Sequence, residues 1–245
     1  MADAVSDPEC PREVEKDPDM SAIRFTVPAV LSFVSVAHAD LDLQWDGMLA
    51  FEQIYYSNVS SDNSVSWDAA ERERSSYAHA GILDINDGAL NLVCIELAQS
   101  VTSESVPYTI SPFESGDDDY ERSLLLSSLF TNSFDAVLAS ESTAMAAAFA
   151  MMTWEIMTEN FDGGPEDMVD QVDIELGAVQ FGDYSVAARE FFDAMKADLF
   201  VASSSDNLIT YRNDEYQDFA GQVPGPGGLA LLFTSGLLTR RRRRS

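Results

Sequence analysis

The sequence contains few of the residues from which metal centres and most enzyme active sites are built. It holds two cysteines and two histidines in 245 residues. Cys10 and His38 lie in segments that we expect to be removed, which leaves Cys94 and His79. A single cysteine excludes an intramolecular disulfide, and a Ser-His-Asp or Cys-His site would have to use His79. We therefore expect a protein that is not an enzyme and that has no resident metal or cofactor.

Positive charge is also scarce. The chain has 14 lysines and arginines against 42 aspartates and glutamates, and residues 40–222 alone hold 35 acidic and six basic residues. A surface this negative repels nucleic acids and anionic membranes, so we expect no nucleic-acid partner. Hydrophobic residues make up 46% of the chain, which is enough for a folded domain with a core.

The N-terminal region is predicted to be an export signal and not part of the fold. Residues 1–19 are polar and acidic, and we interpret them as a mis-assigned leader before a true start at Met20. Residues 20–39 then have the three parts of a signal peptide: a positive charge at Arg24, an apolar stretch over 25–36 and a small-x-small end. The expected signal peptidase site is formed by Ala37, Ala39 and Asp40, with cleavage after Ala39.

The C-terminal region combines an apolar segment with a basic end. Residues 227–239 have the length of one short membrane pass. The basic cluster that follows is expected to stay cytoplasmic, so the domain before it lies outside the inner membrane. This cluster consists of Arg240, Arg241, Arg242, Arg243 and Arg244.

A short motif precedes the apolar segment and consists of Val223, Pro224, Gly225 and Pro226. The order of motif, apolar segment and arginines resembles the PEP-CTERM sorting signal of Gram-negative and planctomycete-type bacteria. Gly225 departs from the family, which usually has Glu there. The resemblance implies that an exosortase cuts at the motif and passes the protein to the cell surface or the extracellular space. Exopolysaccharide of the extracellular matrix is then a candidate partner.

Between these signals we expect an extracellular domain over residues 40–210 and a polar spacer over 211–222. Residues 41–45 alternate as a half-buried strand does. Residues 80–85 and 89–98, on either side of Asn86-Asp87-Gly88, predict a hairpin.

Helical patterns dominate the second half of the domain. They cover residues 123–139, 142–157 and about 184–200, and Ser142 is the expected N-cap of the Ala-rich second helix. The order of elements predicts an α+β fold in which a small sheet, barrel or sandwich packs with helices. We expect a signal helix and a short C-terminal transmembrane helix to flank this domain.

Three motifs occur in the same order as in the thioester-domain family of bacterial surface proteins. They are a strand at residues 93–96, an Ala-rich helix at 146–156 and a Gly-aromatic segment at 176–181. The chain resembles that family over most of residues 40–200. In the family, a Cys thiol and a Gln carboxamide condense with loss of ammonia to an internal thioester that captures amines.

The resemblance places the family's cysteine at Cys94, but Ala150 stands where the family has its glutamine. Alanine has no carbonyl to offer, so only the fold and the position of Cys94 carry over. Trp154 of the same helix is expected to serve packing. We interpret the domain as a degenerate, non-enzymatic relative of the thioester fold.

Two other functions stay open. The first is a covalent adhesin in which Cys94 bonds to a glutamine outside the matching helix; Gln171 and Gln180 are available. The second is a secreted hydrolase built on carboxylates such as Asp42, Asp84 or Glu96. Calcium is a further alternative, because residues 84–88 and 116–121 are rich in oxygen ligands, although a hairpin turn and a solvated loop explain these segments as well.

Overall fold

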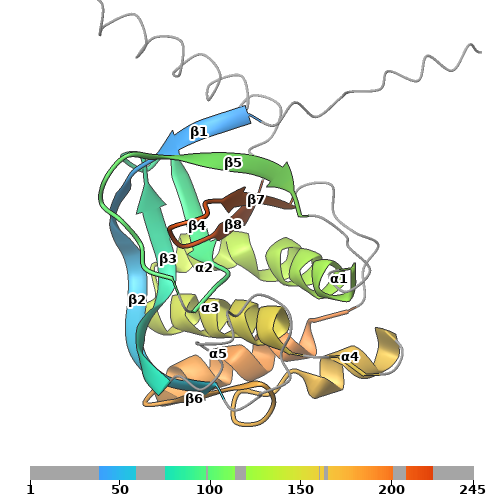
Figure 1. The fold of residues 1–245 in the computed structure, drawn as a ribbon. Coiled ribbons are helices and arrows are strands. Elements are labelled where there is room, and N and C mark those ends of the chain that lie inside the picture. Colours follow the sequence, from blue (N-terminus) through green and yellow to red (C-terminus); the bar gives the residue numbers. More distant parts are fainter. Residues whose placement is uncertain are drawn as a thin grey trace, which may run out of the picture. The chain divides into compact units, whose positions relative to one another are not determined.

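The computed structural model describes residues 39–58, 75–97, 99–113, 120–159, 161–162, 165–200 and 208–222. These ranges form strands and helices in the arrangement of Figure 1. The strands are β1 (Ala39–Leu43), β2 (Trp45–Asn58), β3 (Ser75–Ile85), β4 (Leu90–Cys94), β5 (Val106–Pro112), β6 (Val179–Gly182), β7 (Leu208–Arg212) and β8 (Phe219–Gln222). The helical segments are α1 (Tyr120–Leu129), the π-helical η1 (Phe130–Phe134), α2 (Asp135–Ser140), α3 (Thr143–Thr158), α4 (Pro165–Gln171) and α5 (Val186–Ala197).

All eight strands belong to one antiparallel sheet with the order β1-β5-β7-β8-β4-β3-β2-β6. Only Gln44 separates β1 from β2 in the chain, although the two strands are far apart in the sheet order. The sheet therefore curls, and β1 and β5 cross the upper ends of β2, β3 and β4 in Figure 1. The mixed α+β class expected from the sequence is confirmed.

The β3–β4 hairpin predicted around Asn86-Asp87-Gly88 is also confirmed. All three turn residues have a positive φ, which Asn, Asp and Gly tolerate best. The Asn86 side chain accepts a hydrogen bond from the Gln44 N–H at 2.8 Å and donates one to the Asp42 carbonyl at 3.1 Å. The hairpin turn thus fixes the short link between β1 and β2.

The C-terminal strands correct one expectation. Residues 211–222, predicted to be a polar spacer, contain the end of β7 and all of β8, which lies in the middle of the sheet between β7 and β4. Tyr211 and Phe219 are fully buried there. The helical second half of the domain is therefore interrupted by β6 and followed by two central strands.

Helix α3 occupies the centre of the fold, against the inner face of the sheet on one side and α1, α2 and α5 on the other (Figure 1). Its predicted N-cap is confirmed, because the Ser142 hydroxyl accepts a hydrogen bond from the Met145 N–H at 3.2 Å. Almost every residue of α3 is buried, as its lack of a polar side indicates.

The predicted helix at residues 123–139 is present but irregular. A π-helical turn, η1, separates α1 from α2, and the Phe130 and Phe134 rings pack against Phe149 of α3. The last predicted helix forms as α5, and its apolar face lies on α3 through Ala188, Phe192 and Met195.

Two hydrophobic cores result from this arrangement. The helix-side core lies between α3, the other helices and the inner face of β2 and β3. The strand-side core lies within the curl of the sheet and includes Leu43, Tyr108, Tyr211 and Phe219. Each core buries apolar side chains that one surface of the curled sheet presents.

The predicted export and sorting segments lie outside the described residues, apart from Ala39 and Asp40 at the start of β1. Within the described ranges, no helix is long and apolar enough to cross a membrane.

Candidate functional site

Cys94 ends β4 and is the centre of the site predicted from the sequence. It pairs with Phe219 of β8 and packs against both the helix-side and the strand-side core. Burial raises the pKa of the Cys94 thiol well above its usual range, and the nearby Glu96 carboxylate raises it further. The thiol is therefore protonated at neutral pH, which is the opposite of an activated nucleophile.

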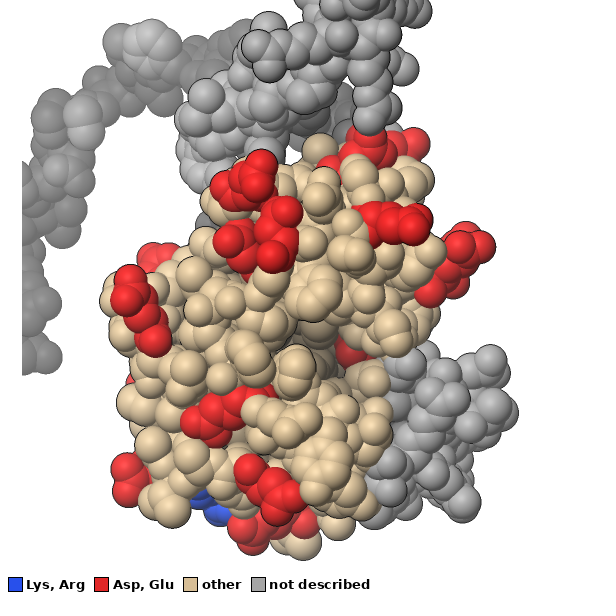
Figure 2. All heavy atoms as spheres, turned by 90° about the vertical axis from the view of Figure 1, so that its left-hand side faces the viewer, with Lys and Arg blue, Asp and Glu red and all other residues tan. Residues whose placement is uncertain are grey.

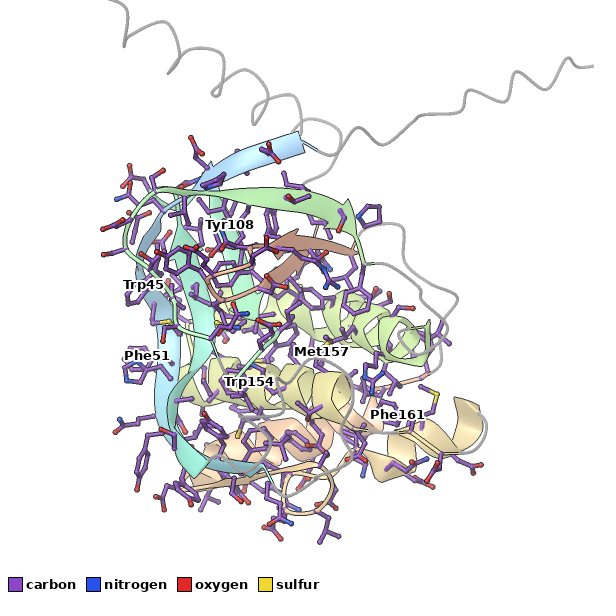
Figure 3. The ribbon with its side chains drawn as sticks, in the orientation of Figure 1. Trp45, Phe51, Tyr108, Trp154, Met157 and Phe161 are labelled. Atoms are coloured by element: carbon purple, nitrogen blue, oxygen red, sulfur yellow. The ribbon has the colours of Figure 1, made fainter. Side chains whose placement is uncertain are left out.

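Ala150 and Trp154, the other predicted site residues, lie on α3 and are buried in the helix-side core that Cys94 also contacts. Trp154 stacks on Phe181 of β6 with ring centroids 6.2 Å apart, so its expected packing role is visible (Figure 3). Its indole N–H has no hydrogen-bond partner among the described residues.

The two glutamines considered from the sequence are poorly placed to meet Cys94. Gln180 lies on β6, three strand spacings or about 14 Å from β4 across the sheet. Gln171 ends α4 and is engaged locally, since its carboxamide bonds to the backbone N–H and carbonyl of Asp162.

A third glutamine was missed because it falls in the segment that reads as a spacer. Gln217 is buried, and its Nε2 donates to the Glu96 carbonyl at 2.5 Å. Cys94 pairs with Phe219, the first residue of β8, and Gln217 lies two positions before that strand. Only the strand pairing, which links distant parts of the chain, brings the segments that contain these two residues together.

A second polar group in the interior is formed by Glu155 and Glu159, one turn apart at the end of α3. Glu155 Oε1 accepts the Asp173 N–H at 3.2 Å, and Glu159 Oε2 accepts the Ala178 N–H at 2.9 Å. Both carboxyl groups converge on Gly177, where a Cβ would collide with them and where φ is +96°. The positive φ favours glycine at 177, and a Cβ there would also force the two carboxylate ends to shift.

Glu155 is fully buried, and its Oε2 has no hydrogen-bond partner among the described residues. Burial is the main cause that raises the pKa of Glu155 to about 9, and the Glu159 and Asp173 carboxylates add to it. The group is therefore neutral at pH 7. Its contacts hold the segment 173–178 on the end of α3, which is a structural role.

The remaining candidates lie on several different elements of the fold. His79 lies on the exposed face of β3 beside Phe51, and within the described ranges no hydrogen bond joins it to a Ser or Asp side chain. Asp42, Asp84 and Glu96 belong to β1, β3 and the chain after β4. The pocket bordered by Trp45 and Tyr108 has no space for a water molecule. No cluster of three potential metal ligands occurs in the described part of the chain.

Comparisons with family models, with curated proteins and with solved structures found no match to this chain.

Proposed function

We propose that this protein is an exported, non-enzymatic component of the cell surface or extracellular matrix, processed at both ends by signal peptidase and an exosortase-type enzyme. The observation that carries the proposal is the position of the fold between the two signals. β1 begins at Ala39, at the expected signal peptidase site, and β8 ends at Gln222, directly before Val223 of the sorting motif. Both cuts would therefore leave the sheet complete except for Ala39, the first residue of β1.

The composition of the folded part supports an external role. Residues 40–222 carry a large excess of acidic residues, which suits a soluble domain in contact with salt and polysaccharide. The protonated thiol of Cys94 and the neutral carboxyl of Glu155 support a passive module, since neither is prepared for nucleophilic or acid-base chemistry in an accessible site.

The test is the intact mass of the protein released from its native cells. We expect a mass that corresponds to residues 40 to about 224. A mass that includes residues 1–39 or the arginine cluster would overturn the proposal.

A second candidate function is favoured by one observation, the burial of Gln217 two residues before Phe219, the strand partner of Cys94. In that function, the Cys94 sulfur attacks the Gln217 carboxamide carbon, the C–N bond breaks, and ammonia leaves with the thiol proton. The product is a thioester that a surface amine could open. The raised pKa of the thiol weighs against this reaction.

The same mass spectrum decides between the two functions. A mass lower by one ammonia, restored by methylamine as a covalent adduct and absent in Cys94→Ser, would establish the thioester. An unmodified mass in the wild type would exclude the thioester and support the first function, a surface component that forms no covalent bond.

A further inference from the structure

The outer face of the β2–β3 ribbon is turned away from α3 and carries aromatic side chains. We refer to Phe51, Tyr55, Tyr77 and His79 as the aromatic face. Phe51 is 39% exposed and Tyr77 is 58% exposed, and Leu49 beside them is 47% exposed. The helices cover the opposite side of these strands, as Figure 1 shows.

The rings are organised in two cross-strand pairs. Phe51 of β2 lies 4.6 Å from His79 of β3 between ring centroids, and Tyr55 lies 5.5 Å from Tyr77 in an edge-on contact. Phe51 and Tyr55 are four positions apart along β2, about 13 Å, and His79 and Tyr77 are two positions apart along β3, about 7 Å. The aromatic face is thus an extended platform.

Glycines keep this platform open. Gly81 pairs with Phe51, and Gly182 of β6 pairs with Tyr55. A Cβ at Gly81 would collide with the carbonyl oxygen of Ala50 and with Phe51, and a Cβ at Gly182 would touch the Tyr55 ring at 3.7 Å. Because neither glycine has a side chain, neither contributes atoms that would cover the two rings.

Stability does not account for these residues. An antiparallel sheet with one face on a core normally presents polar side chains to solvent on the other face. Here three of the six exposed large hydrophobic side chains in the described residues lie on one strand pair, namely Leu49, Phe51 and Tyr77. A concentration of exposed apolar surface on one face of a soluble domain marks an interaction site.

Charge restricts what can bind. The strands β2, β3 and β6 contain no lysine or arginine. An acidic group lies at the edge of the aromatic face, where the Asp183 carboxylate accepts a hydrogen bond from the Tyr77 hydroxyl at 3.1 Å. Figure 2 shows this side of the molecule, with acidic side chains distributed around uncharged surface. Polyanions are repelled by such a surface.

We propose that the aromatic face binds a neutral polysaccharide chain. A sugar ring has one apolar C–H face that stacks on an aromatic ring and a rim of hydroxyls that need hydrogen-bond partners. The face offers both, since the exposed Gln53 lies between Phe51 and Tyr55 on β2 and pairs with the exposed His79, whose ring nitrogens can also bond to a hydroxyl. This inference adds the class of partner to the proposed function. It depends on the proposed function only for the place, the cell surface or extracellular matrix, in which the protein would meet the polysaccharide.

The experiment is isothermal titration of the purified full-length chain with short oligomers of β-linked glucose, N-acetylglucosamine and mannose, and with oligogalacturonate as a polyanion. We expect binding to at least one neutral oligomer and none to oligogalacturonate. Phe51→Ala and Tyr77→Ala should each weaken the affinity by roughly three- to tenfold, the range for loss of one aromatic contact.

Leu176→Ala is the matched control, because Leu176 is a 64% exposed apolar residue outside the β2–β3 ribbon and its variant should bind as the wild type does. Tyr55→Ala provides a further variant on the platform if either of the others fails to fold. Absence of binding to every neutral oligomer would overturn the inference. Preference for oligogalacturonate, or binding that Phe51→Ala and Tyr77→Ala leave unchanged, would also overturn it. The binding results do not depend on the mass of the native protein. The proposal on polysaccharide binding and the proposal on sorting can therefore be overturned independently of each other.

Discussion

The two faces of the β2–β3 ribbon differ in their exposure to solvent, although successive residues of each strand alternate between them. The inner face carries Ala50, Ile54, Ala80 and Ile82, all buried against α3. The outer face carries the exposed rings of the aromatic face. Packing in the core explains the side chains of the inner face, but it does not explain those of the outer face.

The largest effect in this comparison is expected for Ile54→Ala on the inner face. Ile54 is fully buried, and its truncation leaves a cavity that neighbours in the helix-side core cannot fill. The free energy of unfolding should fall by about 3 kcal/mol, within the range for such truncations. Phe51→Ala on the outer face should change it by less than about 1 kcal/mol. Urea unfolding of both variants measures the contrast, and equal losses would contradict it.

The second effect is a dependence of stability on pH, and it comes from the carboxyl group of Glu155 that is buried at the end of α3. Unfolded Glu155 releases its proton near its ordinary pKa of 4.5, whereas folded Glu155 keeps it up to about 9. The unfolded state therefore binds fewer protons between these values, and stability falls as pH rises. The contribution of this group is up to about 1.4 kcal/mol per pH unit.

Glu155→Gln removes the titration and keeps the shape of the side chain. Urea unfolding at pH 6 and pH 8 measures the free energy of unfolding, which should fall less between these two pH values in the variant than in the wild type. The wild-type slope also contains the repulsion among other carboxylates, so the difference between the two slopes is the relevant quantity. Parallel slopes would show that Glu155 is already ionised in the folded protein.

The smallest effect belongs to the outer face. The hydrogen bond to Asp183 is the main cause that raises the pKa of Tyr77 above its usual value. Asp183→Asn should therefore lower that pKa, without a measurable change in unfolding. Ultraviolet titration of the phenolate in wild type, Asp183→Asn and Tyr77→Phe isolates the contribution of Tyr77. An unchanged titration curve would mean that the contact does not persist in solution.

Local signals in the sequence predicted local structure well. The β3–β4 hairpin follows from Asn86-Asp87-Gly88, and α3 follows from an Ala-rich segment with Ser142 at its start. Both depend on residues within a few positions of each other, where turn and capping chemistry act.

Elements that depend on distant pairing were not predictable in this way. Residues 211–222 read as polar, yet Gln217 and Asp218 are buried because backbone groups bind their side chains. The Gln217 carboxamide donates to the Glu96 carbonyl of a distant segment, and the Asp218 carboxylate accepts the nearby Asn213 N–H. The buried state of Glu155 was likewise hidden, since a carboxylate beside Trp154 gives no sign that a loop from 173–178 covers it. The aromatic face was missed because alternation alone does not say which side of a strand meets the core.

The position of β8 has a consequence for the order of events in the cell. β8 is the last strand in the chain, and it joins β7 to β4 in the middle of the sheet. Without it the sheet order breaks into two pieces, β1-β5-β7 and β4-β3-β2-β6. Pairings between such distant segments form late and slowly during folding. The whole domain must therefore be synthesised before its sheet can close.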